Sequence, residues 1–143
     1  MGLAATGDLS ADTREGRIIC EEMKAIGVNW LFGPMADINN NPDNPVINIR
    51  SFGADPMRVG EFVSPFTNGV RSAGCLSPLK YFPGHGDTAT DSHIGLSALP
   101  INRAHLDSVE LVPFKAAINS GVDAVMTAHV AVPKVGEPGS GIP

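Results

Sequence analysis

LSPLKYFPGHGDTATDSHIGLS, residues 76–97, joins a short apolar run to a long polar loop. The run at 76–82 is predicted to be a strand, and the glycine-rich stretch at 83–97 a loop leaving its C-terminal end. Four titratable side chains fall close together in this loop: His85, Asp87, Asp91 and His93. A loop on a rigid sheet can aim several side chains at one point, so this segment is the candidate functional site.

Helical and strand patterns alternate on both sides of this unit. Apolar residues at helical spacing predict helices over residues 10–26, from Asp55 and Pro56 to Gly74, and over about 103–120. Ser10 is expected to cap the first helix, Pro65 to kink or split the second, and the third to restart near Pro113. Short apolar runs predict two further strands at 28–35 and 122–128, and residues 36–51 form a long polar loop.

The order of these elements favours parallel βαβ units with functional loops at the C-terminal ends of the strands. The pattern contains three strands, whereas a closed (β/α)₈ barrel typically needs about 250 residues. The chain has 143 residues. The pattern alone therefore fits either a small open α/β domain or part of a barrel.

Composition excludes several classes of protein. Hydrophobic residues make up 43% of the chain and the net charge is −5, as in an ordinary folded domain. The scattered Lys and Arg residues and the few aromatic side chains argue against a nucleic-acid partner. We find no apolar run long enough to span a bilayer. Cys20 and Cys75 lack disulfide-framework or metal-site spacing and are interpreted as two buried free thiols.

Residue types alone leave three interpretations of the loop open. Asp91 could fix the tautomer of His93 so that its other ring nitrogen exchanges a proton near neutral pH. Alternatively, His85, Asp87, Asp91 and His93 could bind a divalent metal such as zinc or iron. In the third interpretation, the carboxylates cap turns and the histidines bond to backbone carbonyls.

Three segments resemble the β-N-acetylhexosaminidases of glycoside hydrolase family 3. Residues 80–93 (KYFPGHGDTATDSH) are similar to the family's KHFPGHGDT…DSH signature. Residues 36–56 (ADINNNPDNPVINIRSFGADP) resemble its DVN…NP…RSFG.DP loop. Residues 110–129 (ELVPFKAAINSGVDAVMTAH) resemble its EL.PF…AI..GV..VM..H segment. The likeness covers nearly the whole chain in order.

The resemblance implies a retaining exo-hydrolase that releases terminal β-linked N-acetylglucosamine from oligosaccharides or peptidoglycan fragments. His93 would be the general acid/base and Asp91 its partner, where most retaining glycosidases use a carboxylic acid. Arg50, Lys80 and Tyr81 match sugar-binding positions of the family. Tyr81 departs from the pattern, which has His there, and a phenol cannot become cationic.

The likeness also suggests roles for the remaining polar side chains. His129 is expected to line the site, although a buried histidine bonded to backbone is an equal alternative. His85 and Asp87 are interpreted as organising the loop, and as possible site-lining residues. His105 is expected to be solvated on its helix. No cofactor or metal is implied.

The second carboxylate of a retaining mechanism has no counterpart here under the resemblance. We therefore expect the chain to be a central fragment, residues 1–143, of a family 3 N-terminal (β/α)₈ barrel, holding about three consecutive βα units. The fragment is expected to be inactive alone, since the nucleophile Asp would lie beyond its C-terminus. A metal-dependent hydrolase and a non-catalytic sugar-binding fragment remain as alternatives. The compartment stays open between bacterial cytoplasm and periplasm or secretion.

Overall fold

The protein is described here from a computed structural model, which covers residues 2–91 and 93–135. The α-helices are α1 (Gly2–Thr6), α2 (Leu9–Ala25), α3 (Pro56–Ser72), α4 (Arg103–His105) and α5 (Leu111–Asn119). A 3₁₀ turn, η1 (Asn48–Arg50), lies in the first long loop, and a π-helical segment, η2 (Leu106–Glu110), joins α4 to α5. The strands are β1 (Pro78–Phe82), β2 (Ser97–Ala98), β3 (Ala124–Thr127) and β4 (Val130–Ala131).

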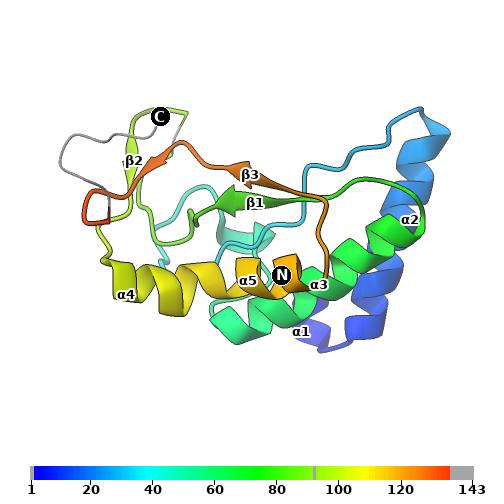
Figure 1. The fold of residues 1–143 in the computed structure, drawn as a ribbon, viewed down its shortest axis with the longest axis horizontal. Coiled ribbons are helices and arrows are strands. Elements are labelled where there is room, and N and C mark those ends of the chain that lie inside the picture. Colours follow the sequence, from blue (N-terminus) through cyan, green and yellow to red (C-terminus); the bar gives the residue numbers. More distant parts are fainter. Residues whose placement is uncertain (1, 92, 136–143) are drawn as a thin grey trace.

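The strands pair in parallel, as the alternating pattern predicted. β1 pairs with β3, and the two-residue strands β2 and β4 pair with each other. In Figure 1, α3 and α5 run along one side of β1 and β3. This arrangement brings the ends of β1 and β3 to the same edge, where the polar loops begin. The short strands β2 and β4 were not predicted, because two residues carry no detectable period.

The segment at 28–35 is less regular than the predicted strand. Among the described residues, its β-bridges to β1 and to the residues before β1 are limited to Trp30–Leu76 and Met35–Lys80. Pro34, between these bridges, has no N–H to donate to a ladder. The Gly33 carbonyl accepts the Ser77 hydroxyl instead, at 2.6 Å. The segment at 28–35 therefore still runs parallel to β1 as an irregular third strand beside it.

The helix boundaries follow the sequence signals closely, with one correction. Asp8, not Ser10, is the N-cap of α2: its Oδ1 accepts the backbone N–H groups of Ser10 and Ala11 at 2.9 and 3.0 Å. The first turn of a helix has free backbone N–H groups, and an Asp side chain at the N-cap position can accept two of them. This explains why Asp8 rather than Ser10 caps the helix. Asp55 caps α3 as predicted, and Gly27 follows α2 with a φ of 82°.

Of the two proline effects expected from the sequence, the split of the second helix at Pro65 does not occur. α3 runs unbroken from Pro56 to Ser72 with Pro65 inside it, and it packs against α2 and α5. The third helical region changes type just before Pro113, as the expected restart near this residue required. The π-helical segment η2 ends at Glu110, and α5 begins at Leu111 with Pro113 in its first turn, where a proline is tolerated.

Helices α2 and α3 approach each other through glycines. A Cβ on Gly16 would collide with the carbonyl of Phe66, and one on Gly69 would collide with the carbonyl of Thr13. Only residues without side chains permit this backbone separation. The close crossing places Cys20 of α2 beside the residues that lead into β1.

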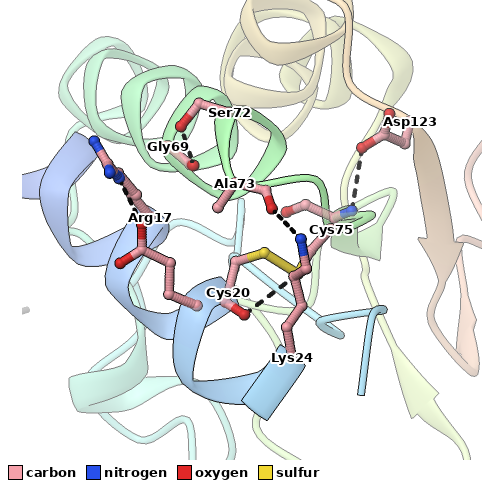
Figure 2. Close-up of a disulfide and its surroundings, with 10 residues drawn as sticks. Arg17, Cys20, Lys24, Gly69, Ser72, Ala73, Cys75 and Asp123 are labelled. Atoms are coloured by element: carbon pink, nitrogen blue, oxygen red, sulfur yellow. Dashed lines mark hydrogen bonds and ion pairs between the residues drawn. A yellow bond between two sulfur atoms is a disulfide. The ribbon is translucent and has the colours of Figure 1, made fainter. Parts of the chain in front are cut away.

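Cys20 and Cys75 form a disulfide, so the interpretation as free thiols is wrong (Figure 2). Their Cα atoms lie 5.8 Å apart although 55 positions separate them in the sequence. Such a separation gives no sequence signal, because connectivity depends on the tertiary packing. Both residues are buried with Phe66 and Val70 in one apolar cluster.

The main core lies between the helices and β1. Its buried members are Ala36, Ile38, Val59, Val63, Leu79, Phe114 and Ala117. A smaller cluster of Leu99, Ile101, Leu106 and Val130 supports the region around β2 and β4. Within the described residues, no helix combines the length and the apolar character needed to cross a membrane.

Candidate active site

The candidate site lies where β1 and β3 end. A pocket of about 210 Å³ opens there, lined by Val46, Tyr81, His85, His93, Met126, Thr127, Ala128 and His129. The pairing extends past β3, since Ala128 donates its N–H to the Phe82 carbonyl at 2.7 Å. Parallel pairing therefore brings His129 to the same edge as the loop that follows β1. Three histidines from two segments converge on one pocket.

Asp91 and His93 form a hydrogen-bonded pair at this pocket. Oδ1 of Asp91 lies 2.7 Å from Nδ1 of His93 and also accepts the His93 backbone N–H at 2.9 Å. The backbone N–H and then the ring lower the pKa of Asp91. An ionised carboxylate only accepts, so Nδ1 carries the proton and Nε2 is the free ring nitrogen. The His93 side chain is 82% exposed, which leaves Nε2 accessible.

His85 is held firmly at the base of the loop. Its side chain is buried, and Nδ1 lies 2.7 Å from the Thr88 hydroxyl. Burial lowers the pKa of this imidazole. Nε2 is buried and has no hydrogen-bond partner among the described residues. His85 therefore both organises the loop and presents a neutral ring to the pocket.

Two buried side chains from the first long loop fasten the second. The carboxylate of Asp37 accepts the backbone N–H groups of Tyr81 and His85, at 2.9 and 2.7 Å. The amide of Asn44 donates to the carbonyls of His85 and Gly86, at 2.7 and 2.9 Å. These bonds fix the direction of the backbone before and after the histidine.

Burial of Asp37 is nearly complete, and it raises the pKa of this carboxyl to about 7, while the two N–H donors and Arg50 favour the charged form. Neither Asp37 nor Asn44 was predicted to belong to the site. Both fall in the loop that resembles the family pattern, but the richness of residues 36–51 in Asn and Asp predicts local turns rather than long-range bonds.

The three residues matched to sugar-binding positions come together around one ring. The Arg50 guanidinium carbon lies 6.0 Å from the centroid of the Tyr81 ring, and Lys80 Nζ lies 5.3 Å from it. Arg50 also donates to the Val46 carbonyl at 3.2 Å. Arg50 and Lys80 lie outside the pocket lining, whereas Tyr81 belongs to it. The cluster thus places two cations at the rim of the pocket.

Asp87 and His105 lie elsewhere than the sequence suggested. Asp87 is not part of the pocket lining and instead lies near Glu110, at the end of η2. His105 is only 38% exposed, and its Nε2 is buried, so the expectation of a solvated ring is wrong. The η2 segment turns this ring toward Glu110 rather than toward solvent.

The alternative of a metal site at His85, Asp87, Asp91 and His93 is not realised in the geometry. Within the described residues, no three of these four bring ligand atoms within 4.8 Å of one another. Nδ1 of His85 contacts Thr88, and His93 contacts Asp91. The loop therefore holds a hydrogen-bonded Asp91–His93 pair rather than a convergent ligand set.

Comparison with known proteins gives the family. Residues 1–141 match the glycosyl hydrolase family 3 N-terminal domain. The chain belongs to glycosyl hydrolase family 3.

Relatives within family 3 point to hexosaminidases. The chain is 40% identical over 138 residues to a β-hexosaminidase A from Pseudoalteromonas piscicida, covering 93% of this chain and 23% of that protein. It is 35% identical to a β-N-acetylglucosaminidase/β-glucosidase from Cellulomonas fimi, covering 93% and 24%. The solved family 3 β-N-acetylglucosaminidase of Paenibacillus sp. str. FPU-7 superimposes with a TM-score of 0.91 at 47% identity, covering 94% and 26%. The chain thus spans about a quarter of the length of each of these three relatives.

Proposed function

We propose that this family 3 chain supplies the acid/base part of a retaining exo-β-N-acetylglucosaminidase. Its substrate would be a carbohydrate ending in β-linked N-acetylglucosamine, such as an oligosaccharide or a peptidoglycan fragment. The observation that carries this proposal is the 2.7 Å contact between Asp91 Oδ1 and His93 Nδ1 at the pocket. It fixes the ring so that Nε2 exchanges protons with the sugar linkage.

Retaining hydrolysis uses this ring twice. In the first step a carboxylate attacks the anomeric carbon while His93 Nε2–H gives its proton to the departing glycosidic oxygen. In the second step Nε2 takes a proton from water, and the water oxygen displaces the carboxylate from the anomeric carbon. Asp91 stays ionised throughout and stabilises the imidazolium that His93 forms between the two proton transfers.

The nucleophile is proposed to come from a segment outside these 143 residues, so that the chain alone is inactive. None of the eight described residues that line the pocket carries a carboxyl group. The chain also spans only about a quarter of its relatives. Sugar binding without turnover is the behaviour we expect of the isolated chain.

Arg50, Lys80 and Tyr81 are proposed to hold the sugar. The two cations can donate hydrogen bonds to ring hydroxyls, and the Tyr81 ring offers an apolar face and one hydroxyl. The Arg50 guanidinium carbon and Lys80 Nζ lie 6.0 and 5.3 Å from the centroid of the Tyr81 ring, which supports a shared role for the three residues at the rim. Such a clamp would orient the pyranose over His93.

We also propose that residues 1–143 form part of a (β/α)₈ barrel, as about three consecutive βα units. The parallel order of residues 30–35, β1 and β3 supports this. Trp30 and Phe32 of the first segment alternate with Val28 just before it, and these side chains are 46%, 58% and 41% exposed. Apolar side chains with period two are typical of a strand face that neighbouring strands enclose.

A chimera provides the test. The matching stretch of the Paenibacillus β-N-acetylglucosaminidase, 26% of that chain, would be replaced with this sequence. We expect the chimera to hydrolyse 4-nitrophenyl N-acetyl-β-D-glucosaminide and the isolated chain not to. His93→Ala in the chimera should lower turnover by a factor of about 10²–10⁴. Thr90→Ala, an exposed residue of the same loop, is the matched control.

Two outcomes would contradict the proposal. A folded chimera that keeps its rate after His93→Ala would exclude the acid/base role. Hydrolysis by the isolated chain would show that a carboxylate within these residues completes the site. A preference of the chimera for the matching β-glucoside would keep the mechanism and replace the proposed substrate, as the name of the Cellulomonas fimi relative allows.

A further inference from the structure

A second group of titratable side chains lies away from the pocket. Asp87 of the loop after β1, His105 of α4 and Glu110 of η2 each offer one ligand atom, and these atoms all lie within 4.8 Å of one another. Nε2 of His105 lies 3.8 Å from Oε1 of Glu110, which is too long for a hydrogen bond. None of these three side chains lines the candidate active site.

Glu110 is buried without a partner. Its side chain is 0% exposed, and neither carboxylate oxygen has a hydrogen-bond partner among the described residues. Burial, and then the charges of Asp87 and Asp37, raise the pKa of Glu110 to about 7, while the Asn40 amide favours the charged form. Burying a carboxylate without hydrogen bonds or a counter-charge is costly, so such a group either takes up a proton or pairs with a cation such as a metal ion.

The backbone around Glu110 is arranged to bring the carboxylate there. A Cβ on Gly84 would collide with Oε2 of Glu110, so any larger residue here would have to displace the Glu110 side chain. Gly84 also has a φ of 137°, which favours glycine. The loop is thereby held directly against the helix, with Asp87 three residues further along.

The η2 segment places His105 and Glu110 on the same side. Five residues make about 1.4 turns of an α-helix, which would separate the two side chains around the axis. In a π-helical turn the hydrogen bonds run over five residues, and positions five apart come nearly into line. The N–H of Leu111 bonds to the Leu106 carbonyl in this way. Single π-helical turns are rare and occur often at functional sites.

We infer that Asp87, His105 and Glu110 form a binding site for one divalent transition-metal ion of the zinc class. One imidazole and two carboxylates are a common ligand set for such ions, and water would complete the coordination. Atoms that share an ion at about 2.1 Å lie at most about 4.2 Å apart. The observed 3.8 Å between His105 and Glu110 meets this limit, and all three ligand atoms lie within 4.8 Å of one another.

The charges match this ligand. Two carboxylates and a neutral imidazole together balance the two positive charges of the ion. The ion would tie the loop that carries Asp91 and His93 to the helical layer at η2. Its expected effect is therefore to stabilise the fold and fix the loop, and the inference stands apart from the proposed glycosidase activity.

Titration of the full 143-residue chain with Zn²⁺ tests the inference. The tag-free protein would be stripped with EDTA, dialysed and titrated in a calorimeter, and its Tm followed at each ratio. We expect one equivalent of Zn²⁺ to bind and raise the Tm. Asp87→Asn and His105→Gln should each weaken binding by at least about tenfold. Both residues are only half-buried, so these variants are expected to fold; Glu110→Gln is the third variant.

Control variants separate this site from adventitious binding. His93→Gln removes the exposed ring that pairs with Asp91, and Asp107→Asn removes a carboxylate of η2 outside the cluster. Both should bind Zn²⁺ as the unmodified chain does. Absence of binding at millimolar Zn²⁺ would overturn the inference. So would binding that His93→Gln abolishes or that Asp87→Asn and His105→Gln leave unchanged.

Discussion

Asp37 and His85 are joined by a hydrogen bond from the backbone N–H of His85 to Oδ1 of Asp37, at 2.7 Å across 48 positions of sequence. The other carboxylate oxygen accepts the Tyr81 N–H at 2.9 Å. One buried side chain therefore sets the path of the backbone on both sides of Phe82. The position of His85 depends on this anchor.

Asp37→Asn should loosen the loop while leaving the helices in place. An amide keeps one acceptor but presents N–H donors to the second backbone N–H, so one buried donor loses its partner. We expect the free energy of unfolding, measured in urea, to fall by about 1–3 kcal/mol. Amide exchange at Tyr81 and His85 should accelerate. Asp43→Asn, an exposed carboxylate of the same long loop, is the control. Unchanged exchange at both amides would show that Asp37 does not anchor the loop.

Asp91→Asn should impair the proposed proton transfer without removing the ring. The amide oxygen can still accept from Nδ1 of His93, but the negative charge that stabilises the imidazolium is lost. In the chimera we expect turnover to fall by about 10–10³-fold. The alkaline limb of the pH–rate profile should move to lower pH. A profile that matches the parent chimera in shape and position would argue against the pair, whatever the absolute rate.

Much of the fold could be predicted from local patterns. The helical period around α2 and α3, the Asp55-Pro56 start and the apolar run of β1 are all local signals, and the structure confirms them. The parallel pairing of β1 and β3 followed from their alternation with helices. The density of titratable residues already marked the pocket loop as the candidate site but left three interpretations of it open. The family resemblance favoured the acid/base interpretation.

The features that were missed depend on distant contacts. The Cys20–Cys75 disulfide forms because α2 and the segment before β1 pack together, which no spacing rule reveals. The burial of Glu110 and the turn of His105 toward it depend on η2, whose five-residue hydrogen bonds leave no distinct period. Asp37 looked like one more turn residue in a polar loop. Its carboxylate acquires a role only when the second loop folds over it.

Reduction of the disulfide should destabilise the protein considerably. Closing a loop of this 55-residue separation removes chain entropy from the unfolded state worth about 4 kcal/mol in the loop-entropy account. We expect dithiothreitol to lower the Tm by about 10 °C. The double variant Cys20→Ser/Cys75→Ser should have the Tm of the reduced protein, and dithiothreitol should not change it. Thiol titration of the denatured, unreduced protein should find no free cysteine. Two titratable thiols would restore the sequence-based interpretation.

Asp12→Asn should flatten the dependence of stability on pH. Asp12 is fully buried in α2, and its carboxylate oxygens have no hydrogen-bond partner among the described residues. Burial, reinforced by Glu15, raises the pKa of Asp12 from 3.8 to about 7. The folded state therefore holds this proton more tightly than the unfolded chain does. The resulting stability is complete below about pH 4, declines as the pH rises, and is lost above about pH 7.

The shift corresponds to at most roughly 4 kcal/mol between pH 4 and pH 8. Asn is neutral throughout, so the variant should gain stability relative to the unmodified chain as the pH rises across this window. Urea unfolding at both pH values measures the difference, and Glu22→Gln on the exposed side of α2 is the control. Asp37 also has a raised pKa and contributes a slope in the same direction. Only the difference between variant and unmodified chain therefore isolates Asp12. A difference that stays constant from pH 4 to pH 8 would mean that Asp12 is ionised in the folded protein.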